Sequence, residues 1–210
     1  MDDFIPFGSR AYCLLVLLLA FSRGMDFLST WVATPNLVLE GNPIAKKLGW
    51  GWGGLLNIGI CLGMALWPAT AIAVSTMSVL VAARNFQSAW LMRSMGEENY
   101  RDWHVSRIQE TRVTVYLYCL AGNTLLTAAV GTAMILSSTS YIPVSIGMGM
   151  VGYAAAVAFY TTLAIWRLRR ASHRRERHPP APAAILVNGA PLKSSLVDSC
   201  ACETGEFPGK

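Results

Sequence analysis

Residues Trp52–Met92, WGGLLNIGICLGMALWPATAIAVSTMSVLVAARNFQSAWLM, decide the fold of this chain. The segment holds one charged residue, Arg84, and as a single helix it would measure about 60 Å at about 1.5 Å per residue. The hydrocarbon core of a bilayer is about 30 Å thick, so about 20 apolar residues cross it. The segment must fold back on itself. We expect the hinge at Trp67 and Pro68, because proline disfavours helix in the residue before it and Trp prefers the membrane interface.

The rest of the chain extends this pattern to five spans. The composition is 53% hydrophobic and 14% charged, whereas about 25% of residues are charged in a soluble domain. We therefore predict an all-α protein, an integral membrane helical bundle that occupies residues 1–170. The transmembrane helices are expected at residues 11–33, 52–67, 69–92, 113–136 and 142–166.

The two ends of the chain are expected to be polar. Residues 171–210 are basic and then rich in Pro and Ala, which is typical of a disordered tail. The amino terminus begins Met1-Asp2-Asp3, where a cleavable signal peptide would carry positive charge, so we expect none.

The distribution of Lys and Arg predicts the orientation. With five spans, fourteen positively charged residues fall on the side of the tail and one, Arg10, on the other. Positive charge accumulates on the cytoplasmic side. We therefore expect an N-out/C-in protein of a bacterial-type inner membrane with a cytoplasmic tail. The basic segment Arg167–Arg177 directly follows a span, which favours contact with anionic lipids over nucleic acid.

Polar residues inside the first span share one helical face. Arg23, Asp26, Thr30 and Thr34 recur at steps of three and four residues. A charge at membrane depth costs at least a few kcal/mol unless it is paired or hydrated. This face should therefore look into the bundle, and Arg23 and Asp26 can pair along the helix.

Three further spans bring polar groups to a similar depth. Counted from their cytoplasmic ends, Asp26, Asn57, Arg84 and Asn123 lie roughly 8 to 15 Å inside the membrane at 1.5 Å per residue. Asn85 adds to the third span. We predict a polar site in this layer, closed by the opposite charges of Asp26 and Arg84.

A short motif after the first span adds two residues to the candidate site. In Glu40-Gly41-Asn42-Pro43, the proline suits the first turn of a new helix and the asparagine suits its cap. A helix that begins beside Glu40 would cover the polar layer, so Glu40 and Asn42 join the candidates.

Together, Asp26-x-x-Ser29-Thr30 and Glu40-x-Asn42-Pro43 resemble a signature of small, uncharacterised bacterial multi-span membrane proteins. The resemblance covers residues 26–43. It implies a membrane location and several spans, and it brings no established activity.

These residues leave three functions open. The site binds or transports a small solute, an ion or a lipid headgroup; or its polar groups only hold helices together in a structural or assembly partner; or Asp26 and Glu40 serve a membrane enzyme as paired carboxylates. No catalytic residue, metal site or cofactor is predicted, since all three histidines fall in loop or tail. The sequence also leaves a homo-oligomer open.

Glycine and cysteine motifs have simpler interpretations. Gly147-Met-Gly149-Met-Val-Gly152 matches a dinucleotide-binding pattern, but it lies within an apolar span and not between a strand and a helix. We expect these glycines, and Gly59 and Gly63, to mark close helix contacts. The pair Cys200 and Cys202 is expected to be incidental.

Overall fold

A computed structural model describes residues 4–37, 43–177, 186–187 and 190–191, with side chains over residues 4–37 and 47–170. The chain forms two units, Met1–Arg169 and Arg170–Lys210. In the second unit, β1 (Leu186–Val187) pairs antiparallel with β2 (Ala190–Pro191), where the sequence predicts no fold.

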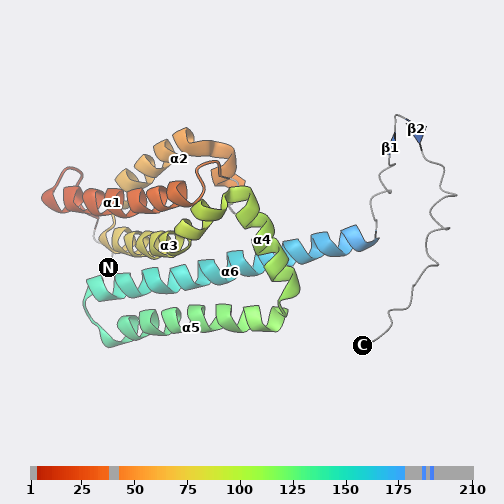
Figure 1. The fold of residues 1–210 in the computed structure, drawn as a ribbon. Helices are drawn as coiled ribbons and strands as arrows, with labels where there is room; N and C mark the ends of the chain where they lie inside the picture. The colour runs from red at the N-terminus through yellow and green to blue at the C-terminus, as the bar shows by residue number, and fades with distance from the viewer. Residues whose placement is uncertain (1–3, 38–42, 178–185, 188–189, 192–210) are drawn as a thin grey trace. The chain divides into compact units, whose positions relative to one another are not determined.

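The first unit is a bundle of helices (Figure 1). The described residues form six helices: α1 (Arg10–Ala33), α2 (Pro43–Met64), α3 (Pro68–Met95), α4 (Glu97–Glu110), α5 (Val113–Ser137) and α6 (Tyr141–Arg177). Among the residues searched, four stretches are long and apolar enough to cross a membrane: α1, α3, α5 and residues 141–170 of α6. This confirms the prediction of a helical membrane bundle.

The predicted hinge is confirmed. Helix α3 begins at Pro68, and Trp67 before it is extended, with φ −119° and ψ 103°. Proline suits this position because the first helical residue needs no N–H partner and the ring fixes φ.

Two helix boundaries differ from the prediction. Helix α2 begins at Pro43, as the proline indicates, and not at Trp52, and it is broken at Gly49, where φ is 65°. Glycine adopts this left-handed backbone without a steric penalty, so the regular part of α2 covers residues 50–64. Helix α6 runs on to Arg177, beyond the expected boundary at residue 170, because arginine and alanine favour helix.

Helices α1 and α3 run in the same direction. Residue numbers increase together along the hydrogen bonds that join the two helices and their flanking residues. These bonds join Ile5 with Leu66, Arg23 with Ser78, Thr30 with Asn85, and Thr34 with Glu97. Helix α2 runs the opposite way, since Tyr12 bonds to the carbonyl of Leu62 and the indole of Trp50 bonds to that of Pro35. Figure 1 shows α2 returning along α1 before α3 begins.

Small residues form the seam between α1 and α3. The buried residues of α1 are Tyr12, Leu19, Ser22, Ser29 and Ala33, and those of α3 are Ala71, Ser75, Ser78, Ala82 and Ala89. They recur at steps of three, four and seven, the spacing of two parallel helices that wrap around each other. Small side chains let the two backbones approach closely, which is how helices associate in lipid.

Glycines bring α6 against α5 and α3. A Cβ on Gly147 would meet the backbone of Gly131, and one on Gly149 would meet the carbonyl of Ala73. A Cβ on Gly152 would lie 3.1 Å from the sulfur of Met77. The prediction of helix packing is therefore confirmed for Gly147, Gly149 and Gly152.

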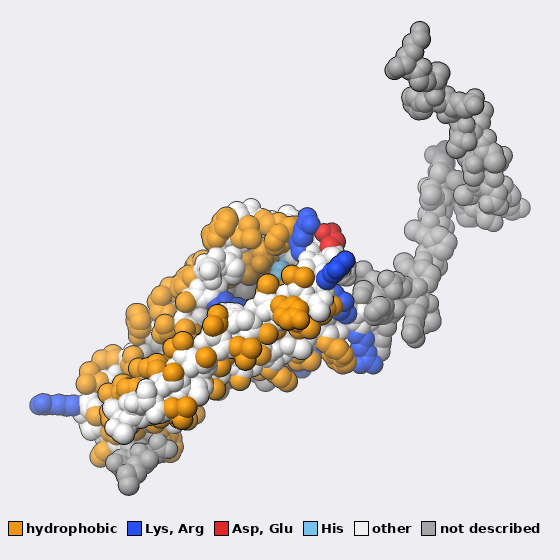
Figure 2. All heavy atoms as spheres, turned by 90° about the horizontal axis from the view of Figure 1, so that it is seen from below, with side chains coloured by type: hydrophobic (Ala, Val, Ile, Leu, Met, Phe, Trp, Pro, Cys, Tyr) orange, Lys and Arg blue, Asp and Glu red, His pale blue; other side chains and the backbone are white. Residues whose placement is uncertain are grey.

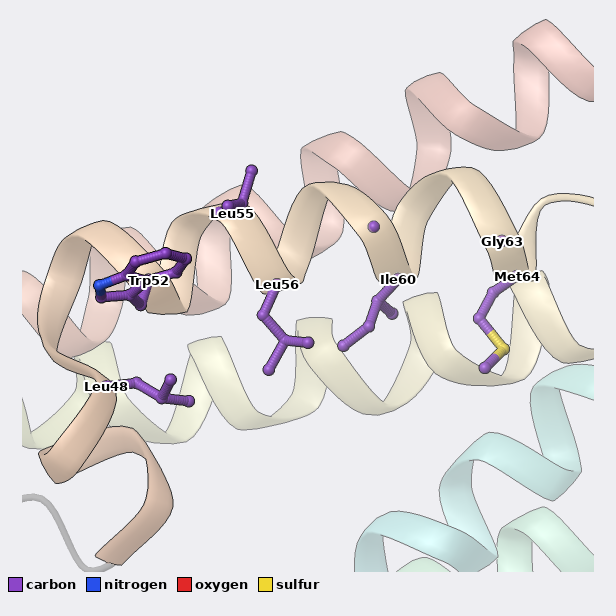
Figure 3. Close-up of a pocket in the computed structure, with 8 residues that line it drawn as sticks. Leu48, Trp52, Leu55, Leu56, Ile60, Gly63 and Met64 are labelled. Atoms are coloured by element: carbon purple, nitrogen blue, oxygen red, sulfur yellow. The ribbon is translucent and has the colours of Figure 1, made fainter.

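The same prediction is wrong for α2 within this chain. Among the described residues, nothing lies within 4 Å of a Cβ added to Gly59 or Gly63. Both line an apolar groove of about 540 Å³ on α2 (Figure 3). The side chains of Leu56, Ile60 and Met64 project to one side of the helix there.

Basic residues and tryptophans gather toward one end of the helices. The end of α1 and Arg169 of α6 lie at the two ends of α4, since Thr34 bonds to Glu97 and Arg169 bonds to the carbonyl of Thr111. Most of the described Arg residues lie at this end of the helices, namely Arg93, Arg101, Arg107, Arg112, Arg167 and Arg169, whereas Arg10 lies at the start of α1. Figure 2 shows apolar side chains along the helices and Lys and Arg concentrated at one end. Six of the seven Trp residues also lie toward this end of their helices: Trp31, Trp50, Trp52, Trp90, Trp103 and Trp166.

Candidate functional site

The candidate site begins with an ion pair inside α1. Ser9 caps this helix by accepting a hydrogen bond from the N–H of Tyr12 at 3.2 Å, and the helix then continues without a break to Ala33. Arg23 and Asp26 lie one turn apart on it. Nη1 of Arg23 donates to Oδ2 of Asp26 at 3.0 Å, so each side chain neutralises the other within an otherwise apolar span.

Arg23 also joins α1 to both neighbouring helices. Its Nε and Nη2 donate to Oδ1 of Asn57 in α2, at 2.8 and 2.5 Å, and its Nη1 donates to Oγ of Ser78 in α3 at 3.3 Å. A guanidinium has five N–H groups in a planar fork. Four of them are used here, which fixes the orientation of the plane.

A second set of bonds lies one turn further along α1. Nδ2 of Asn85 in α3 donates to the hydroxyls of Ser29 and Thr30, both at 3.3 Å. These hydroxyls donate in turn to the backbone carbonyl of Asp26, at 2.8 and 3.0 Å. We call the seven residues the polar cluster: Arg23, Asp26, Ser29, Thr30, Asn57, Ser78 and Asn85.

The charged pair at the centre of the polar cluster is not sealed. The side chains of Arg23 and Asp26 keep 25% and 19% of their surface exposed, whereas Ser29 and Ser78 around them are buried. Asp26 has a further interaction beyond its bond to Arg23. The pair therefore combines fixed geometry with an accessible edge.

The structure brings five of the nine predicted site residues together: Arg23, Asp26, Thr30, Asn57 and Asn85. Glu40 and Asn42 lie outside the described residues. The other two predicted residues, Arg84 and Asn123, are exposed, and neither side chain bonds to the polar cluster within the part of the chain that is described.

The predicted closure of the site by Asp26 and Arg84 is not seen in the described part of the chain, where Asp26 pairs with Arg23 and the side chain of Arg84 is exposed. Neighbouring residues on a helix point about 100° apart. Because Asn85 faces α1, Arg84 next to it must point elsewhere.

A carboxylate near the end of α1 was missed. Oε2 of Glu97, in the first turn of α4, accepts from the hydroxyl of Thr34 at 2.8 Å. Its Oε1 accepts from the backbone N–H and the side-chain amide of Asn36, at 3.0 and 3.1 Å. Glu97 thus ties the end of α1 to the junction of α3 and α4, on the same side of α1 as the polar cluster.

Helix α4 carries the one histidine whose side chain is described. The ring of Tyr100 stacks on that of His104, with centroids 5.7 Å apart. Burial lowers the pKa of His104 and raises the pKa of Tyr100, because it disfavours the charged form of each. His104 lies in the connection between α3 and α5, far along the chain from the polar cluster.

Metal chemistry finds no support in the described residues, where no three His, Cys, Asp or Glu side chains group to hold an ion. No family model matches the chain, and no curated protein or solved structure matches it either. The resemblance over residues 26–43 therefore stays a prediction, and the site has to be interpreted from its own chemistry.

Proposed function

We propose that the chain is a five-span protein of a bacterial-type inner membrane, with its amino terminus outside and its basic tail in the cytoplasm. The parallel course of α1 and α3 supports five spans, because the chain between them has to return across the same thickness. Among the described residues of that interval, α2 is the one helix. Its regular part measures about 22 Å at 1.5 Å per residue, a short span of the kind that bilayers accommodate by local thinning.

The orientation rests on the concentration of basic residues at one end. Arg93, Arg101, Arg107 and Arg112 lie on or beside α4, and Arg167 lies at the end of the α6 span. The positive-inside rule assigns this end to the cytoplasm, where the segment Arg167–Arg177 contacts anionic lipids. A reporter enzyme that is active only in the cytoplasm should therefore be active when it is fused after Arg177. A reporter that is active only outside the cytoplasm should be inactive at the same position.

Within this protein, we propose that the polar cluster binds or transports a small solute, an ion or a lipid headgroup. One observation carries the proposal: Arg23 and Asp26 lie about 10 Å or more from the cytoplasmic end of α1 and still keep an accessible edge. Ionisable residues in spans are costly and usually serve a function. A well-packed apolar pair would often stabilise the helices equally well, so stability alone does not account for the charges.

A structural role is the second candidate, and the bonds of Arg23 favour it. Four guanidinium N–H groups connect α1 with α2 and α3, as expected of polar groups that hold helices together. A membrane enzyme that uses Asp26 and Glu40 stays a third hypothesis, and we lean against it because no catalytic set forms among the described residues.

Asp26→Asn separates the first two candidates. The full chain is purified with the variant and with Arg84→Gln as a matched control that removes an exposed charge from the same bundle. Binding and flux are measured per folded molecule with a panel of small cations, anions and zwitterions. A binding site predicts loss for Asp26→Asn only. A structural role predicts that accumulation falls while nothing measured per folded molecule changes.

A further inference from the structure

Asn123 belongs to the predicted site but does not bond to the polar cluster, so its place in the membrane needs another explanation. It lies on α5, ten residues after Val113 and fourteen before Ser137. These separations correspond to about 15 and 21 Å, so the residue is close to the middle of the span. The side chain is exposed, and its amide forms no hydrogen bond with any described residue.

This position is unfavourable in a single copy. An amide without a partner loses the hydrogen bonds that water gives it, and lipid offers none in exchange. Long side chains such as Arg84 can extend toward the interface, but an asparagine is too short to do so. The threonines of α5 avoid the problem, since Thr124 and Thr127 donate to carbonyls of their own helix.

Most of α5 is exposed, its one buried residue being Gly131, and the face that carries Asn123 provides a continuous stripe with the spacing of a helix seam. Exposed residues recur along α5 at steps of four and three: Cys119, Asn123, Leu126, Val130 and Ala133. In two parallel helices that wrap around each other, such positions face the partner, and one polar Asn among them fixes the register. A different side of α5, about 80° around the helix from Asn123, is already used, since Gly131 packs on Gly147 of α6.

We propose that this face of α5 binds the same face of a second copy, with Asn123 bonded to Asn123 across a two-fold axis. An amide carries N–H donors and a carbonyl acceptor, so two symmetric copies can bond reciprocally, each donating one N–H to the carbonyl of the other. Copies in one membrane share an orientation, which makes the two α5 helices parallel and brings equal depths together. This inference is independent of the proposed function of the polar cluster.

Cys119, one turn before Asn123, provides the test, because the seam places two copies of it close together. In the full chain, Cys13, Cys61, Cys200 and Cys202 are replaced by Ser, and membranes are oxidised with copper phenanthroline. We expect a disulfide-linked dimer. The matched control carries Cys119→Ser and Leu125→Cys, which places the thiol about 120° around the helix from position 119 on another exposed face. This variant should give little dimer.

Variants of Asn123 then test whether the amide itself contributes to association or whether the two α5 helices are only close together. An interhelical amide bond contributes about 0.6 to 2 kcal/mol, so Asn123→Leu should weaken association roughly three- to thirtyfold across a series of protein-to-lipid ratios. Asn123→Gln should retain most of it. The proposal is overturned if Cys119 reacts with maleimide but gives no dimer, or if it forms a disulfide only with a protein of another mass. It is also overturned if Asn123→Leu leaves the yield of dimer unchanged. Should Asn123→Leu fail to fold, Asn123→Gln and the two thiol positions still decide.

Discussion

The ion pair of Arg23 and Asp26 yields a quantitative prediction, because each residue is costly without the other. Removing one partner of a buried pair typically destabilises a protein by about 3 to 5 kcal/mol, whereas replacing both is much less harmful. The pair keeps 25% and 19% of its side-chain surface exposed, so solvent screening should bring the loss to the lower limit of that range or somewhat below it. We expect Asp26→Asn and Arg23→Met each to lower the free energy of unfolding by about 2 to 3 kcal/mol.

The double variant is the informative one. Arg23→Met with Asp26→Asn removes both charges together, and what it loses is the set of bonds to Asn57 and Ser78. We expect a total loss of about 2 kcal/mol, which leaves a coupling of about 2 to 4 kcal/mol between the two sites. The measurement is unfolding of the purified chain by SDS titration in mixed micelles. If the single effects add within about 0.5 kcal/mol, the pair is not coupled and the interpretation of the polar cluster fails.

Three further predictions concern other parts of the bundle. Gly147→Val should reduce folded protein severely, since its side chain would enter the backbone of α5, whereas Gly59→Ala should leave monomer stability nearly unchanged; gel filtration in detergent distinguishes the two. Glu97→Gln should speed proteolysis between α1 and α2, because a neutral amide holds Thr34 and Asn36 less well; a smaller effect from Glu98→Gln is the control. Burial lowers the pKa of His104, so the folded state favours the neutral ring. The stability that this ring contributes is complete above the unfolded pKa near 6.5 and is lost as the pH falls below that value. Melting temperatures measured from pH 8 to 5.5 should fall accordingly, and His104→Gln should remove this pH dependence.

Much of the fold follows from local sequence. The hinge at Trp67 and Pro68 is set by the length of one apolar stretch and by the chemistry of two residues, and α3 begins where that reasoning puts it. The start of α2 at Pro43 follows from the same rules. Its first turns were not predicted as part of a span because they carry Lys46 and Lys47, and the break at Gly49 was missed because a glycine gives no sign of its φ in the sequence.

The candidate site was predicted only in part, and geometry explains why. Arg84 and Asn85 are adjacent in sequence, and hydropathy cannot tell which of them faces α1; the structure selects Asn85. A repeat of small residues at steps of three and four, with Ser78 among them, does point to the buried side of α3. Glu97 had no such signal, since its partners follow the end of a helix far earlier in the chain.

The bond between Arg23 and Asp26 also bears on how the protein is made. Helix α1 is synthesised first, and the hydroxyl of Ser78 that Arg23 requires emerges only after α2 is complete. Until then the helix must remain in lipid without its neighbours. A counter-ion one turn away lets α1 enter the bilayer as a net-neutral segment and wait there, so assembly of the three helices can follow insertion instead of accompanying it.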